Sequence, residues 1–309
     1  MTPTSTTQPQ LPATMRFIER DWLSANGIFF DDGQSTALID TGYIKHRDMT
    51  LAVLRELLGQ RPLDQIINTH LHSDHCGGNA LLQRTYLSRT LIPAASAPAV
   101  RDWNQTALTF ERTGQRCEPF TLDGTIDDGD ELTLGGLQWQ VIAAPGHDPH
   151  AVVLYCESHR ILISADALWQ NGFGVIFPEL EGESGFAEQR AILERIRSLK
   201  VDIVLPGHGP LFTNVDEAIE RACRRLDHLG SDPARNARHA TKVLLKFLLL
   251  EHQQVALDAV PALLNTIPLI DLANQRYIGM PADELARWAV DELVRAGAAR
   301  IDRQMLIDA

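Results

Sequence analysis

The segment His70-Leu71-His72-Ser73-Asp74-His75 places three imidazole groups and a carboxylate within six consecutive residues. Ordinary packing does not need so many titratable side chains together, whereas imidazole nitrogens and carboxylate oxygens are common zinc ligands. In an extended segment, side chains two residues apart point the same way, so His70 and His72 can converge on one ion. After a turn of the chain, Asp74 and His75 can face a neighbouring position. This segment therefore predicts a metal site and a fold that brings further ligands to it.

The residues around this cluster predict strands and helices in alternation. Apolar runs bounded by turn residues indicate strands, and apolar residues at helical spacing indicate helices. Gly77-Gly78, after the cluster, would let the backbone turn tightly before the next helix. We expect an α/β layered domain, with strands at 27–30, 37–42, 65–68, 132–134, 137–143, 151–156, 160–164 and 201–205, and helices at 48–58, 186–199 and 215–229, the last capped by Asn214.

Three further candidate ligands follow predicted strands. His147 comes after the strand at 137–143, Asp166 after the strand at 160–164, and His208 after the strand at 201–205. Loops at the ends of strands are where α/β folds build their sites. One histidine on a loop carries little weight, but three such residues in addition to the cluster indicate a shared metal site.

The cluster, followed in order by His147, Asp166 and His208, resembles the metallo-β-lactamase superfamily. The resemblance covers about residues 15–229 and includes the strand end Ile39-Asp40-Thr41-Gly42. It implies a four-layer αβ/βα sandwich, in which two β-sheets face each other with helices outside and a dinuclear site at the edge. By position, the implied ligands are His70, His72 and His147 for the first metal, Asp74, His75 and His208 for the second, and Asp166 as a bridge.

Two divalent ions that share one water lower its pKa from 15.7 toward about 7, so a metal-bridging hydroxide can act as the nucleophile. We expect it to attack an ester-like carbonyl. Asp74 is the candidate catalytic residue, and the sequence leaves open whether it acts as a ligand or as a proton shuttle to the leaving group. Zinc is the first choice by ligand type, and iron or manganese would also suit nitrogen and oxygen donors.

The two Pro-Gly-His segments, at 145–147 and 206–208, are similar to those of glyoxalase-II-type thioester hydrolases. The sequence departs from that group after His208, where Gly209-Pro210 replaces the usual Glu-Tyr-Thr. His72 stands where a diiron oxygen-reducing branch would carry an acid. The resemblance therefore implies hydrolysis of a small-molecule carbonyl ester or thioester, in the manner of a hydroxyacylglutathione hydrolase, and leaves the particular substrate open.

The character of the chain changes after Gly230-Ser231-Asp232-Pro233, which we interpret as a linker. Beyond it we expect helices at 239–251, 254–264 and 283–296 and a strand at 299–302. The predicted division is a flexible tail (1–14), a metallo-β-lactamase domain (15–230) and a helical, winged-helix-like domain (231–309). Similar extensions occur in a branch with endoribonuclease activity. The alternatives are therefore a metal-dependent endoribonuclease or nucleic-acid-processing enzyme, and a regulatory metal-binding protein that acts through partners.

The charge of the chain argues against a nucleic-acid partner. The 28 basic and 40 acidic side chains give a net charge of −12, which repels phosphate backbones. The helix expected at 283–296 carries four acids and two arginines, so packing or a homodimer contact suits it better. The four cysteines are dispersed, and neither a signal-peptide pattern nor a membrane-length apolar run is evident. We therefore expect reduced thiols in a soluble cytoplasmic protein.

Other conspicuous side chains have two interpretations each. We expect Cys76 to pack, although it adjoins a candidate ligand. Asp40 is a candidate for orienting a ligand, and His150 either hydrogen-bonds a ligand or only begins a strand. Core or lid packing, in preference to substrate contact, is expected for the aromatic residues Trp103, Trp169, Phe173 and Phe177. A basic helix face, either solvated or open to an anionic substrate, is formed by Arg221, Arg224 and Arg225.

Overall fold

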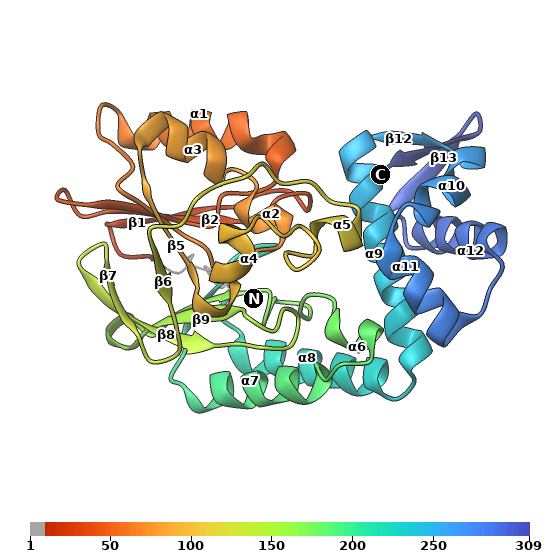
Figure 1. Ribbon diagram of the computed structural model, residues 1–309. Coiled ribbons are helices and arrows are strands. Elements are labelled where there is room, and N and C mark those ends of the chain that lie inside the picture. The colour runs from red at the N-terminus through yellow and green to blue at the C-terminus, as the bar shows by residue number, and fades with distance from the viewer. Residues whose placement is uncertain (1–9) are drawn as a thin grey trace, which may run out of the picture.

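In the computed structural model, which describes residues 10–309, short apolar strands form two sheets that lie face to face (Figure 1). The first sheet has the order β1-β2-β3-β4-β5-β6, with β1 (Met15–Ile18), β2 (Gly27–Asp31), β3 (Thr36–Ile39), β4 (Gln65–Ile67), β5 (Arg89–Pro93) and β6 (Gly124–Ile126). The second has the order β11-β10-β9-β8-β7, with β7 (Glu131–Leu134), β8 (Leu137–Ala143), β9 (Val152–Cys156), β10 (Ile161–Ala165) and β11 (Ile203–Pro206).

Successive side chains of a strand point to opposite faces of its sheet. Because the strands carry apolar side chains on both faces, each sheet packs against the other sheet on one face and against helices on the other. In β3, Ile39 enters the core between the sheets, whereas Leu38 packs outward with the helix residue Leu54. In β9, Leu154 faces the other sheet and Tyr155 packs outward. The outer layers are α1 (Arg47–Leu58) and α3 (Asn79–Tyr86) on the first sheet, and α7 (Phe186–Ser198) and α8 (Val215–Gly230) on the second (Figure 1). The predicted αβ/βα sandwich is confirmed.

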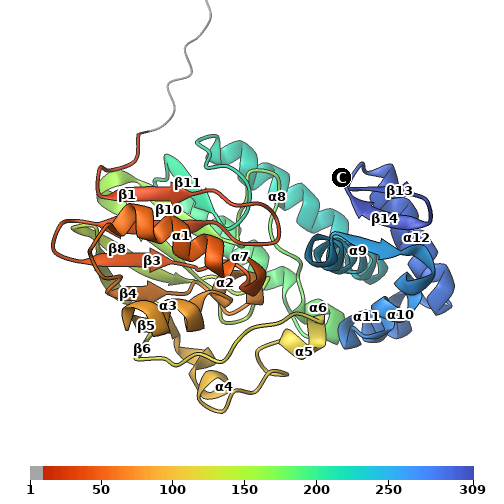
Figure 2. The ribbon, with the colours of Figure 1, turned by 90° about the horizontal axis from the view of Figure 1, so that it is seen from above.

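The C-terminal part is helical, with a small sheet of its own, and lies at one end of the sandwich (Figures 1 and 2). The long helix α9 (Pro233–His252) runs between the two parts. The remaining elements are α10 (Val260–Asn265), α11 (Pro268–Ala273), a π-helical turn (Asn274–Ile278), α12 (Ala282–Arg295) and an antiparallel sheet of β12 (Gln254–Ala256), β14 (Met305–Asp308) and β13 (Ala299–Asp302). Within the described range, no helix has the length and apolar content needed to cross a bilayer.

Several C-terminal predictions are wrong in detail. The helix expected at 254–264 begins only at Val260, because residues 254–256 pair with β14, a strand that the local pattern did not indicate. The helix expected from His239 begins at Pro233 instead. Asp232 caps it by accepting a hydrogen bond from the Ala234 N–H at 3.0 Å. The expected linker is therefore reduced to a two-residue turn between α8 and α9.

Other predicted boundaries in the sandwich also differ from the structure. Asn214 precedes α8 but does not cap it through its side chain, which donates to Glu217 at 3.2 Å instead. The strand expected at 201–205 is β11 at 203–206. The strand expected at 37–42 ends at Ile39, because the next residue, Asp40, has a φ of 56°, which is outside the strand region. Of the expected flexible tail, residues 1–9 lie outside the described residues, and Thr14 is held by a hydrogen bond from its hydroxyl to the Gly135 carbonyl at 2.8 Å. The division into domains stays a prediction.

Glu251, near the end of α9, joins the C-terminal part to the sandwich. Its buried carboxylate accepts hydrogen bonds from the Tyr43 hydroxyl at 3.0 Å and from Arg116 Nε at 2.9 Å. Removing the carboxylate would leave the buried hydroxyl without its acceptor. We expect Glu251→Ala to lower the free energy of unfolding by about 2 kcal/mol in urea denaturation. The exposed Glu220→Ala is the control, and equal stability of the two variants would contradict this role.

Candidate metal centre

Four loops carry the seven candidate ligands to one edge of the sandwich. His70 and His72 follow β4, and the short helix α2 (Ser73–Cys76) carries Asp74 and His75. Strands β8, β10 and β11 run in the same direction, since β9 is antiparallel to both β8 and β10 while β11 is parallel to β10. The carboxyl ends of these strands therefore meet at the same edge, where the loops that follow them bring together His147, Asp166 and His208.

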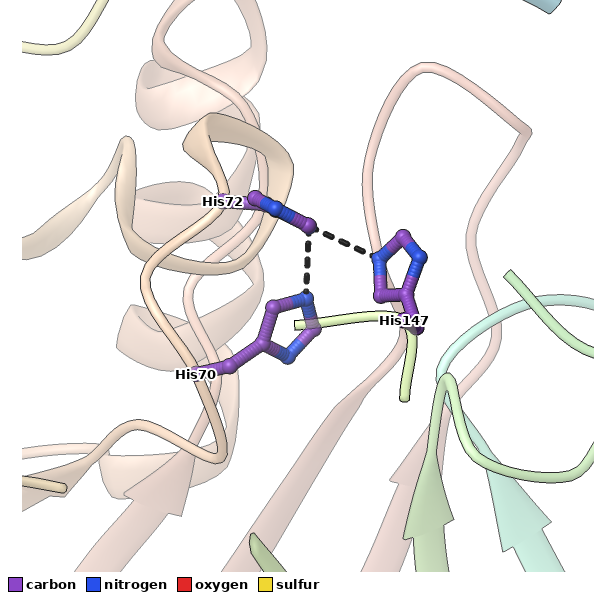
Figure 3. A group of neighbouring side chains, drawn as sticks. All are labelled: His70, His72 and His147. Atoms are coloured by element: carbon purple, nitrogen blue, oxygen red, sulfur yellow. Dashed lines mark hydrogen bonds between the residues drawn. The ribbon is translucent and has the colours of Figure 1, made fainter. Parts of the chain in front are cut away.

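Three histidines form the first group (Figure 3). His72 Nδ1 lies 3.1 Å from His70 Nε2 and 2.7 Å from His147 Nε2. The second ring nitrogen, Nδ1, of His70 and of His147 faces an oxygen atom in each case. His147 Nδ1 donates to the Val175 carbonyl at 2.5 Å, and His70 Nδ1 lies 3.2 Å from the Thr69 hydroxyl oxygen. The lone pairs of His70 Nε2 and His147 Nε2 thus converge on His72, which suits a shared cation.

Burial sets the protonation state of this group. It lowers the pKa of both His72 and His147 to about 4, and holds the pKa of His70 well below its usual value. The three rings are therefore neutral at physiological pH. A neutral imidazole is the form that binds a metal ion, so the group needs no deprotonation before it can act as a ligand set.

Asp74, His75 and His208 form the second group. Asp74 Oδ2 lies 3.1 Å from His208 Nε2 and 3.9 Å from His75 Nε2. Asp166 faces both groups, because its Oδ1 lies 3.4 Å from His75 Nε2 and its Oδ2 lies 3.4 Å from His147 Nε2. In each group the candidate ligand atoms lie within 4.8 Å of one another.

The environment of His75 fits a cation. Its Nδ1 donates to Asp40 Oδ2 at 2.8 Å, which leaves Nε2 buried, without a hydrogen-bond partner, and facing two carboxylates. Burial alone would lower the pKa of His75, but Asp40, Asp166 and Asp74 outweigh it and raise that pKa well above its usual value. A positive charge is therefore favoured at the place where the second group and Asp166 meet. The donors present fit a divalent metal.

Asp40 orients His75, as the sequence suggested. Its carboxylate also accepts hydrogen bonds from the backbone N–H of Thr69 at 2.9 Å and from the Thr69 hydroxyl at 2.8 Å. These contacts fix the carboxylate, and the carboxylate in turn fixes the tautomer and direction of the imidazole. Asp40 itself has a φ of 56°, an uncommon value for a residue other than glycine.

The prediction that Gly77-Gly78 makes a tight turn before the next helix is wrong. Both residues have ordinary helical φ values of −63° and −87°, so no special turn is made there. A Cβ at Gly77 would lie 2.3 Å from the backbone nitrogen of Ile44, and one at Gly78 would lie 2.7 Å from the Thr41 carbonyl oxygen. The two glycines are therefore needed for the close approach of α2 to the segment after β3.

A cavity of about 500 Å³ opens beside the candidate ligands. Trp22, which the sequence analysis did not single out, stacks on His208 with ring centres 5.1 Å apart and an interplanar angle of 6°. Trp169 donates from Nε1 to Asp166 Oδ1 at 3.2 Å. From α9, the cavity also receives His239, Val243, Leu244 and Phe247. No local signal marked Trp22 or α9, because each reaches the cavity only through the fold.

The remaining conspicuous residues divide into two sets. Trp103 packs with Phe110 and Phe120, and Cys76 is buried, as expected. His150 is exposed and, within the described residues, bonds Ser96 at 3.3 Å instead of a candidate ligand. The cavity wall, by contrast, includes Trp169, Phe173, Phe177 and Arg225. Phe173 is at the same time buried in the hydrophobic core, as expected, and the expectation of core or lid packing for Trp169 and Phe177 stays a prediction.

A two-sheet sandwich with this cluster at its edge defines a class of metal-binding hydrolases. Residues 20–208 match the model of the family described as Metallo-beta-lactamase superfamily, and the chain belongs to this superfamily. The chain is 24% identical over 266 residues to a beta-lactamase-like protein 2 homolog of Caenorhabditis elegans, a match that covers 86% of this chain and 72% of the relative. The prediction of a hydrolase of this superfamily is confirmed.

Two further relatives are matched over smaller shares of their length. A hydroxyacylglutathione hydrolase of Idiomarina loihiensis is 32% identical over 117 residues, 38% of this chain and 37% of the relative. An acyl-coenzyme A thioesterase of Gallus gallus is 28% identical over 169 residues, 50% of this chain and 59% of the relative. The chain thus spans between about a third and three fifths of these two proteins, so their activities are not transferred to it directly.

Solved structures support the fold. A B3 metallo-beta-lactamase, BLEG-1, aligns with a TM-score of 0.53 and 24% identity over 67% of this chain and 95% of the other. A metallo-beta-lactamase family protein from Thermus thermophilus aligns with a TM-score of 0.56 and 16% identity over 96% of this chain and 98% of the other. At these identities the likeness concerns the fold alone.

Proposed function

We propose that this chain is a dinuclear metal-dependent hydrolase that cleaves a carbonyl ester or thioester. The observation that carries the proposal is the position of Asp166, whose two oxygens lie 3.4 Å from His75 Nε2 and 3.4 Å from His147 Nε2. One carboxylate in contact with both groups of candidate ligands suits a bridge between two ions. A site for a single ion would need only one of these groups.

The assignment of ligands is part of the proposal. The first ion would be held by His70, His72 and His147, the second by Asp74, His75 and His208, with Asp166 shared. Zinc is the preferred ion because imidazole and carboxylate are its usual ligands, and iron or manganese fits the same donors. When bound, such ions supply a hydroxide nucleophile at neutral pH and polarise a carbonyl oxygen.

The chain itself supplies a group for proton transfer and a cavity beside it. Asp74 lines the cavity, and its carboxylate contacts His208 at 3.1 Å, so it can receive a proton and pass it to a leaving thiolate or alkoxide. Trp22 and Trp169 flank His208, and the Phe177 ring lies 5.3 Å from that of His72. These aromatic rings give the cavity an apolar surface beside the candidate ligands, to which an apolar part of a substrate can pack.

An ester or thioester is favoured over other substrates by two observations. The relatives named hydroxyacylglutathione hydrolase and acyl-coenzyme A thioesterase are thioester hydrolases by name. The cavity has a mainly apolar wall on one side, formed by aromatic and aliphatic residues that include Phe173, Phe177, Val243 and Phe247. Such a wall suits an acyl group better than a polyanionic nucleic-acid strand.

The test is a panel of substrates given to the metal-loaded protein: acyl thioesters, lactones and single-stranded RNA. We expect release of thiol or opening of the lactone to require metal and to fall by about 10²- to 10⁴-fold in Asp74→Asn, because proton transfer is lost. Asp291→Asn, exposed on α12, is the matched control and should keep full activity. Metal-dependent cleavage of RNA, with every ester and lactone left intact, would overturn the proposal.

A further inference from the structure

Arg225 differs from the other arginines of α8 because its side chain lines the cavity. Arg221 and Arg224 lie 3.5 Å and 3.7 Å from the carboxylates of Glu217 and Glu220, one turn earlier in the helix. Arg225 forms no ion pair with any residue between positions 10 and 309. The cavity therefore contains a cation that is not paired with a carboxylate of the described residues.

The surroundings hold the Arg225 guanidinium in one place. It donates to Nε2 of His239 at 2.8 Å, and its Cζ lies 5.8 Å from the centre of the Phe173 ring. The backbone of Gly172 approaches so closely that a Cβ there would lie 3.0 Å from Arg225 Cδ. Its Nε is buried and has no hydrogen-bond partner. A guanidinium that is already ordered loses little freedom when a ligand binds.

His239, on α9, does not neutralise this charge. A guanidinium can only donate, so Nε2 of His239 accepts the hydrogen bond and the ring is not protonated there. Burial, together with the nearby charges of Arg225 and Lys242, lowers the pKa of His239 to about 3. At physiological pH the pair therefore has the charge of the guanidinium alone.

We propose that Arg225, positioned by His239, forms an anion-binding subsite of the cavity that holds a carboxylate or phosphate group of the substrate. A buried cation is costly without a counter-charge, and a guanidinium binds carboxylate or phosphate oxygens through paired donors. The apolar walls formed by Phe173, Val243 and Phe247 suit an apolar segment between the scissile carbonyl and the anionic group. This inference rests on the proposed function, because it narrows the substrate to an ester or thioester with an anionic group.

The test compares three thioesters that differ in charge. The pentanoyl, glutaryl and 5-phosphopentanoyl thioesters of N-acetylcysteamine share one thiol and differ only in whether the acyl chain ends in a methyl, a carboxylate or a phosphate group. We expect kcat/KM of the metal-loaded protein to be about 10- to 100-fold higher for one anionic substrate than for the neutral one. The anionic thioester with the higher kcat/KM shows whether the subsite recognises a carboxylate or a phosphate group.

Variants of the two neighbouring arginines then locate the effect. Arg225→Gln should lower kcat/KM for the preferred anionic substrate by about 10- to 100-fold and so remove its advantage over the neutral thioester. Arg225→Lys, which keeps the charge but not the fork of donors, should retain part of the preference. Arg224→Gln, exposed on the same helix, should change neither value. An equal preference in wild type and Arg225→Gln would overturn the subsite.

Binding separates this inference from the proposed function. Thioether analogues of the same three compounds cannot be hydrolysed, so their affinity for the metal-loaded protein is measured by calorimetry. Tighter binding of an anionic thioether that is lost in Arg225→Gln supports the subsite even if no thioester is cleaved, in which case the proposed function fails alone. Equal binding of charged and neutral thioethers overturns the subsite even if all three thioesters are cleaved.

Discussion

Replacing Asp166 by asparagine is expected to lower hydrolysis by the metal-loaded protein by about 10³-fold or more, because a shared water is no longer activated between two ions. Asparagine keeps the size of the side chain and removes its charge. In the structure, Oδ1 of this carboxylate faces His75 and Oδ2 faces His147. His208 Nε2 lies 3.9 Å from Oδ2. Burial would raise the pKa of Asp166, but His208, His75 and His147 hold it well below its usual value. The carboxylate is thus ionised and available as a ligand.

Metal content is the second measurement on Asp166→Asn. We expect elemental analysis to find fewer bound ions per chain than in the wild type, together with unchanged circular dichroism, since the described residues donate no backbone hydrogen bond to this side chain, which accepts from Trp169 Nε1. Asp291→Asn is again the control with the same chemical change at an exposed position. Full metal content together with full activity would show that Asp166 does not bridge the ions.

Replacing Gly207 by alanine is expected to reduce activity by about 100-fold or more through a steric effect, since a displacement of about 1 Å at a site can cost this much. A Cβ at Gly207 would lie 2.2 Å from Asp166 Oδ1 and 3.0 Å from His75 Cε1. The backbone of Gly207 cannot move away easily. Its N–H donates to the Ala165 carbonyl at 2.7 Å, and its carbonyl accepts from the Asn26 N–H at 2.7 Å. The Asp166 carboxylate must therefore give way.

Gly230→Ala provides the matched control for this substitution. A Cβ at Gly230, at the end of α8, would meet Phe186 at 3.6 Å, which is an ordinary contact. We expect this variant to keep both its activity and its metal affinity. For Gly207→Ala, metal titration should show weaker binding, while the midpoint of urea denaturation of the metal-free protein stays close to that of the wild type. Unchanged metal affinity in Gly207→Ala would mean that the site tolerates a shift of Asp166.

Much of the candidate site could be predicted from the sequence because its ligands follow directly from local patterns. Four of them lie within six residues, and the other three come directly after apolar strands. The strands themselves are recognisable as short apolar runs between turn residues. Since loops at the ends of such strands are where α/β folds build sites, the seven residues could be expected together before any contact was known.

The C-terminal part was predicted less well, for a physical reason. Residues 254–256 have no strong preference of their own, and their strand exists because it pairs with β14 at the other end of this part. Local periodicity contains no information on such a partner. The start of α9 depends on one capping contact, which Asp232 makes. From the sequence alone, a Gly-Ser-Asp-Pro segment is equally consistent with a helix start and with a linker.

The amino-acid sequence by itself therefore determined the fold class and the set of candidate ligands, because both depend on residue type and short spacing. Only the tertiary structure decided what surrounds those ligands. Trp22 stacks on His208 from a loop far away in the chain, and α9 closes one side of the cavity. Arg225 turns inward, although its neighbour Arg224 has the same chemistry and stays in solvent. Contacts between distant segments set these features, and such contacts form only when the whole chain has packed.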